Sequence, residues 1–192
     1  MLESGKSYRA LYDGFSWSLP DAYSIAWDCC DQWAQKDPDR PAIVHEAGDG
    51  TIVNGTYSDL QSAANRLANS LLALGIGAGD RVAILLPQRP ETAITHIACY
   101  KIGAVAVPLA SLFGVEALSF RLRDSDARAI VTDAPGLEKV LSVSDLETVP
   151  LMINVDSANG ANGVHGYSAL VERASDRFQT PLFNPDQPAM MI

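Results

Sequence analysis

Short apolar runs alternate with amphipathic stretches along most of the chain. Three segments are mostly apolar on both faces, as buried parallel strands are: residues 81–86, 104–107 and 128–132. Helical periodicity follows the first two, at residues 90–101 and 115–123, and the alternation continues at residues 137–141, 150–155 and 167–173. This order predicts an α/β fold, with a parallel sheet and helices on both of its faces.

A long amphipathic helix is expected before the first of these runs. It opens at Ser58, which with Gln61 matches a capping box, where each side chain satisfies a free backbone N–H of the first turn. Gly75 is suited to close it, because glycine readily adopts the left-handed backbone that ends many helices. The apolar face expected for this helix consists of Leu60, Ala63, Ala64, Leu67, Ala68, Leu71 and Leu72.

The first part of the chain, residues 1–41, is expected to form an arm that lies on the sheet domain. Residues 21–35 predict a helix, which the prolines that follow would end. Its expected apolar stripe is Ala22, Ile25, Cys29 and Trp33. Residues 42–45 and 51–57 then predict a β-hairpin. The chain is therefore divided into this arm and an α/β subdomain of residues 42–192.

The last residues of the sequence, 187–192, are an apolar run that predicts the beginning of one more strand. An unfinished strand would leave a sheet edge and an apolar face without cover. The sequence therefore predicts a fragment of a longer protein and a tendency of this chain to self-associate.

Composition and charge narrow the classes of partner. A chain of 192 residues, 47% of them apolar, is long enough for a compact domain with a sizeable core. Its formal net charge of −9 disfavours nonspecific nucleic-acid binding, which needs clustered Lys and Arg. No apolar run approaches the roughly 20 residues that cross a bilayer. Three cysteines without C-x-x-C spacing indicate neither a disulfide framework nor a zinc site, so a reduced, cytoplasmic protein is expected.

Several apparent motifs have simpler structural interpretations. The glycine-rich segment 75–80 follows a predicted helix and precedes a predicted strand, the reverse of the order in a phosphate-binding loop, which favours a helix C-cap and a turn. The three histidines lack metal-ligand spacing, which favours a packed or rim position for His96. Cys99 is expected to be a small buried residue, and Asp124 and Asp126 are expected to cap and turn the backbone.

A series of segments carries a resemblance to a known family. They are residues 24–31, 38–43, 56–60, 74–87, 90–91, 101–105, 107–109 and 124–132. In order and spacing they resemble the opening third of the AMP-forming acyl-CoA synthetases, which are adenylate-forming ligases. The aromatic opening at residues 12–33 is most similar to the acetyl- and medium-chain branch. The resemblance implies that the α/β fold is the incomplete N-terminal portion of the adenylate-forming synthetase fold.

The reaction implied by this resemblance has two steps. A carboxylate attacks the α-phosphate of ATP, with Mg²⁺ present, and the CoA thiol then displaces AMP from the acyl-adenylate. Relatives use a glycine-rich phosphate loop, later adenine and ribose motifs and a lysine of a C-terminal domain, none of which lies within residues 1–192. The resemblance therefore assigns this chain no catalytic residue, no metal site and no tightly bound cofactor, and predicts that it does not adenylate by itself.

One cofactor-binding region is nevertheless implied by the resemblance. In acetyl-CoA synthetase-like relatives, the turn after the strand that ends near Pro108 lies beside the CoA nucleotide, and a basic residue near the start of a later helix contacts the CoA 3′-phosphate. By position, the candidate CoA-binding residues are Ser111, Leu112 and Phe113 in the turn and Lys139 on the helix. Acidic Glu138 beside Lys139 departs from the family pattern.

Two other functions stay open. An adenylating ligase that uses another acceptor, such as a carrier-protein thiol, would differ from a CoA ligase in the activity of the intact protein with each acceptor. A non-catalytic binding module derived from a truncated synthetase is the alternative from another class. The acyl chain length is not indicated, since the acid pocket of relatives is built from later residues.

Overall fold

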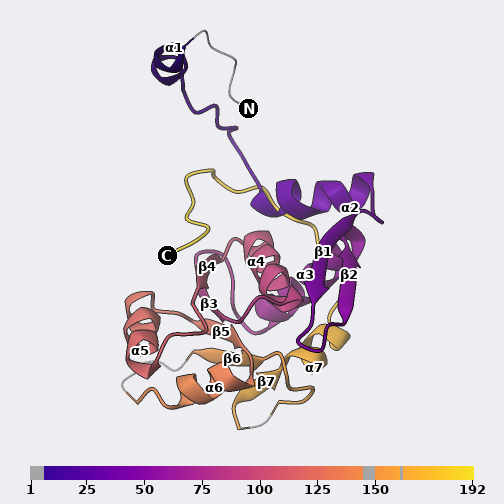
Figure 1. The fold of residues 1–192 in the computed structure, drawn as a ribbon, viewed down its shortest axis with the longest axis vertical. Coiled ribbons are helices and arrows are strands. Elements are labelled where there is room, and N and C mark those ends of the chain that lie inside the picture. The colour runs from indigo at the N-terminus through magenta and orange to yellow at the C-terminus, as the bar shows by residue number, and fades with distance from the viewer. Residues whose placement is uncertain (1–6, 145–149, 161) are drawn as a thin grey trace.

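A five-stranded parallel sheet forms the centre of the molecule (Figure 1). The structure, a computed structural model, describes residues 7–144, 150–160 and 162–192. The strands stand in the order β4-β3-β5-β6-β7, and every neighbouring pair is parallel. They are β3 (Arg81–Leu85), β4 (Val105–Pro108), β5 (Ala129–Thr132), β6 (Leu151–Asn154) and β7 (Val164–Gly166). The predicted α/β class with a parallel sheet is confirmed.

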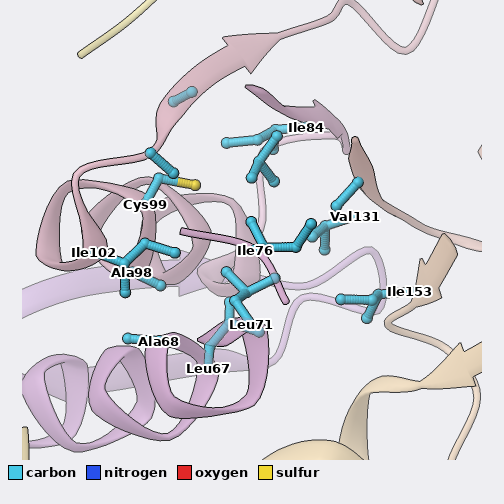
Figure 2. Close-up of a cluster of buried hydrophobic side chains, with 14 of the residues drawn as sticks. Leu67, Ala68, Leu71, Ile76, Ile84, Ala98, Cys99, Ile102, Val131 and Ile153 are labelled. Carbon is cyan, nitrogen blue, oxygen red and sulfur yellow. The ribbon is translucent and has the colours of Figure 1, made fainter. Parts of the chain in front are cut away.

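Helices cover both faces of this sheet. They are α3 (Tyr57–Ala73), α4 (Pro90–Ile102), α5 (Val115–Asp124), α6 (Ala134–Leu141) and α7 (Tyr167–Arg173). Successive strand residues point to opposite faces, so Ile84 packs with α3, α4 and α7 while Leu85 packs with α5 and α6. Figure 2 shows the core on the side of the sheet that α3 and α4 cover, to which Leu71, Ile102 and Val131 belong.

The cap of α3 lies two residues before the predicted one. Thr56 is the N-cap, and its hydroxyl accepts a hydrogen bond from the Asp59 N–H at 3.1 Å while the Asp59 carboxylate accepts one from the Thr56 N–H at 2.9 Å. Ser58 was therefore the wrong cap. The Gln61 side chain does not take part in the capping box, since it donates a hydrogen bond to Asp31 at 2.9 Å. The predicted closing residue is confirmed, because Gly75 has φ +82°.

The N-terminal helix starts later than predicted and contains a π-turn. It comprises η1 (Trp27–Asp31) and α2 (Gln32–Lys36). Its buried apolar residues are Ala26, Cys30 and Ala34, whereas Cys29, in the predicted stripe, is exposed. The predicted stripe was wrong because it assumed a regular helix from residue 21, and a π-turn also inserts an extra residue into the helical register.

Residues 7–22 do not lie on the sheet domain, in contrast to the expected arm. None of these residues is buried, and α1 (Tyr8–Asp13) stands away from the rest of the molecule in Figure 1. Their aromatic side chains make local ring contacts instead, at 6.0 Å between Tyr8 and Tyr12 and 4.9 Å between Phe15 and Trp17. Residues 1–6 of the predicted arm lie outside the described residues.

The predicted hairpin is confirmed as β1 (Pro41–Glu46) and β2 (Ile52–Thr56), which pair antiparallel. The C-terminal segment, residues 176–192, which we name the strap, runs from α7 at one side of the sheet to β4 at the other (Figure 1). There Ala106 donates its N–H to Ala189 O at 3.0 Å, and Met191 donates to Ala106 O at 3.0 Å. The strand expected at the end of the chain is thus present as one parallel bridge, between Ala106 and Met190.

Among the described residues, no helix combines the length and the apolar character that crossing a membrane requires. The tendency to self-associate stays a prediction.

Candidate functional site

The turn after β4 lies at the carboxyl edge of the parallel sheet. Leu109 donates its N–H to Ile84 O at 2.9 Å, which ties the start of this segment to the end of β3. A hydrogen bond of 3.0 Å from the Phe113 N–H to Ala110 O then closes the turn, and Gly114 caps α5 directly after it. Open parallel sheets bind their ligands at this edge, so the local structure places residues 110–113 where a ligand is expected.

Lys139 reaches this turn from α6. Its Nζ donates a hydrogen bond to the backbone oxygen of Ser111 at 2.7 Å. The fold therefore brings together two of the candidate residues that are 28 positions apart in the sequence. Across the described ranges 7–144, 150–160 and 162–192, no carboxylate forms an ion pair with Lys139. The neighbouring Glu138 is exposed.

The other two candidate residues differ from each other in their surroundings. The Phe113 ring packs against the core between the sheet, α5 and α6, and the Arg121 guanidinium stands over it, 4.0 Å from the ring centroid. Leu112 is 93% exposed and points to solvent. Phe113 therefore anchors the turn on the core, while the Leu112 side chain lies in solvent.

A second polar group occupies the point where the strand order reverses, between β3 and β5. Arg89, just before α4, donates to Glu91 at 2.7 Å and to Asp156 at 2.8 Å. The second oxygen of Asp156 accepts the Ala134 N–H at the start of α6, at 2.9 Å. This backbone hydrogen bond, with the Arg89 guanidinium, lowers the pKa of the Asp156 carboxyl below its ordinary value.

The Asp156 carboxylate of this ion pair also lies at a helix N-terminus. The anion that a helix N-terminus attracts is here the protein's own carboxylate, Asp156. Arg89 and Asp156 thus form an ion pair at the edge of the sheet where such folds commonly bind ligands. Sequence reasoning missed this pair, since the two residues are 67 positions apart and neither belongs to a motif.

The remaining candidates have structural roles. Gly75 and Gly79 have φ of +82° and +79°, as a C-cap and a tight turn require. His96 is partly buried beside the Tyr100 hydroxyl, and burial lowers its pKa. Cys99 is fully buried, which raises the pKa of its thiol to about 12 and keeps it protonated. Within the part of the chain that the structure describes, no three metal-ligating side chains gather at one point.

Comparison with protein families gives one match that covers most of the chain. The model of the family described as "AMP-binding enzyme" matches residues 30–192. The acetyl-coenzyme A synthetase of Escherichia coli K12 is 32% identical over 200 aligned residues, which cover 92% of this chain and 30% of that protein. The acetyl-coenzyme A synthetase of Laribacter hongkongensis is 28% identical and covers 89% of this chain and 26% of that protein.

Solved structures share the fold. The acyl-CoA synthetase of Brucella canis superimposes with a TM-score of 0.82 at 29% identity, over 91% of this chain and 32% of that one. An anthranilate CoA ligase in complex with anthranoyl-AMP gives a TM-score of 0.76 at 20% identity, which supports the fold alone. The chain thus spans between about a quarter and a third of the length of these relatives.

Proposed function

Since this chain belongs to the AMP-binding enzyme family, we propose that it is the N-terminal α/β part of a ligase that joins a carboxylic acid to CoA at the expense of ATP. The observation that carries the proposal is the match to acetyl-CoA synthetases over 92% of the chain. Because those relatives are about three times longer, we propose that residues 1–41 and 42–192 are the arm and the first subdomain of a larger enzyme.

The proposed reaction joins the acid and the thiol through a mixed anhydride. A carboxylate oxygen attacks the α-phosphorus of ATP, and the bond to pyrophosphate breaks. Mg²⁺, bound together with ATP, would offset the phosphate charge. The CoA sulfur then attacks the acyl carbon, and AMP leaves with the bonding electrons. Both steps depend on in-line positioning and on charge neutralisation at phosphorus.

The contribution of this chain is proposed to be a contact with CoA. The Lys139 ammonium, which forms no ion pair with a carboxylate of the described residues, suits the doubly charged 3′-phosphate of CoA. The turn beside it offers the exposed Leu112 side chain to the nucleotide, and Phe113 holds the turn on the core. Ser111 links the turn to α6, because its backbone oxygen accepts a hydrogen bond from Lys139.

Lys139→Ala in the full-length protein is expected to weaken CoA binding about fivefold. This corresponds to about 1 kcal/mol, the value of a charge-assisted contact at a partly exposed site. Lys139→Arg keeps the positive charge and serves as the matched control. Isothermal titration with CoA and with dephospho-CoA, which lacks the 3′-phosphate, measures the effect.

The two ligands separate the phosphate contact from a general disturbance of the turn. The proposed contact predicts that Lys139→Ala weakens CoA but leaves dephospho-CoA binding unchanged. An equal loss with both ligands, or unchanged CoA affinity, would show that Lys139 does not bind the 3′-phosphate.

Acid-dependent exchange between ATP and labelled pyrophosphate tests the proposed division of the enzyme. The full-length protein is expected to catalyse exchange when a carboxylic acid is added, because the exchange reports reversible adenylate formation. Residues 1–192 alone are expected to give no exchange above the acid-free background. Exchange by this chain would place the adenylating residues within it and overturn the proposal.

A further inference from the structure

Four side chains from distant parts of the chain meet in a buried polar cluster. Lys101 on α4 is fully buried, and Asp31 at the end of η1 is 4% exposed. Lys101 Nζ donates to Asp31 Oδ1 at 2.5 Å and to Thr180 Oγ1 at 3.2 Å. Thr180 in turn donates to Asp31 Oδ2 at 2.5 Å, and Gln61 Nε2 on α3 donates to Asp31 Oδ1 at 2.9 Å. The buried charges are thus paired and hydrogen-bonded, as burial requires.

Thr180 is the strap's contribution to this cluster. Apart from it, the strap is held by hydrogen bonds between neutral groups and by one partly exposed ion pair, Arg66 Nη2 to Asp176 Oδ2 at 3.4 Å, which solvent weakens. The main ones are Asn65 to Asp176 O at 2.7 Å, the two backbone hydrogen bonds between Tyr23 and Phe183 at 2.8 Å, and Gln187 to Gly103 O at 3.0 Å. Hydrogen bonds to charged groups are about twice as strong as neutral ones. The contact of Thr180 with Lys101 and Asp31 is therefore the strongest polar anchor of the strap.

The strap's apolar contact with the core comes from partly buried side chains, such as Phe178. None of residues 176–192 is buried, so the strap adds no side chain to the fully buried core. The sheet, in contrast, is fixed by strands whose side chains are buried on both faces, such as Ile130 and Val131 of β5. Segments with little buried apolar surface open locally at a lower free energy than the core does.

We propose that the contact of Thr180 with Asp31 and Lys101 is a latch that holds the strap on the body of the protein. Without the Thr180 hydroxyl, the strap detaches as a unit, including its pairing with Ala106, while the five-stranded sheet stays folded. Ala106 belongs to β4, the strand that leads into the 110–113 turn. The latch therefore also maintains the pairing of β4 with Met190 of the strap. This inference does not depend on which ligand the turn binds.

Thr180→Val tests the latch, since valine keeps the shape of threonine and removes only the hydroxyl. Thr180→Ser, which keeps a hydroxyl, is the matched control. Amide hydrogen exchange of the full chain compares two groups of N–H donors. The first is in the strap and its partners, at Phe183, Met191 and Ala106; the second is in β5 at residues 129–132.

The latch predicts that Thr180→Val speeds exchange of the strap amides about tenfold or more, the shift expected for loss of a hydrogen bond to charged groups. The β5 amides should change less than twofold by the same reasoning, and Thr180→Ser should resemble the unmodified chain. Unchanged exchange in the strap would overturn the latch. Equal acceleration in the strap and β5 would overturn it as well, because the contact would then belong to the global core.

Discussion

Lys101→Met is expected to lower the free energy of unfolding by about 3–5 kcal/mol, the cost of leaving one partner of a buried ion pair uncompensated. Methionine fills a similar volume but offers no charge, so the Asp31 carboxylate would stay buried with only Gln61 and Thr180 as donors. Urea denaturation followed by circular dichroism measures the loss.

The double variant Asp31→Leu/Lys101→Met separates a broken ion pair from lost packing. Replacing both charges with apolar groups is often close to neutral, so the double variant should recover at least half of the roughly 3–5 kcal/mol lost in the single variant. If the two substitutions cost the sum of their single effects, or if Lys101→Met costs less than about 1 kcal/mol, the buried pair does not have the role described here.

Leu71→Ala is expected to cost about 3 kcal/mol, because it removes a fully buried side chain and leaves a cavity between α3 and the sheet. Leu72, the next residue on the same helix, is 46% exposed. Leu72→Ala should therefore change stability by no more than about 0.5 kcal/mol. The same denaturation experiment measures both variants.

Similar losses at the two leucines would contradict the register of α3 on the sheet. The pair also tests a point that the sequence pattern did not resolve, since the hydrophobic pattern placed both residues on the apolar face. The buried face of a helix can include fewer residues than the sequence pattern suggests. Tertiary packing determines which of two adjacent apolar residues is buried.

The parts of the fold that were predictable are those with strong local signals. The strands β3, β4 and β5 are mostly apolar because helices cover both faces of the sheet. The left-handed residues Gly75 and Gly103 mark the ends of α3 and α4, since glycine adopts positive φ without strain. In contrast, β7 has only three residues, one of them histidine and one glycine, and so carries no periodic signal.

Features that depend on tertiary contacts were not predictable from the pattern. The π-turn of η1 ends at Asp31, the acidic member of the buried cluster, and no local signal pairs that residue with Lys101, 70 positions later. The residues of the candidate site likewise fall into a predictable and an unpredictable group. The family resemblance led to Lys139 and the turn that it contacts, whereas the pair of Arg89 and Asp156 exists only because the sheet brings two loops together.

Analysis of the products formed by the full-length protein tests the central claim most directly. The protein is incubated with ATP, Mg²⁺, CoA and acetate, with longer carboxylic acids in parallel, and the nucleotides and thioesters are separated by chromatography. An acid–thiol ligase of the AMP-forming type predicts equal amounts of AMP and acyl-CoA. Formation of ADP, or of acyl-adenylate that is transferred to a carrier protein and not to CoA, would contradict the proposed function.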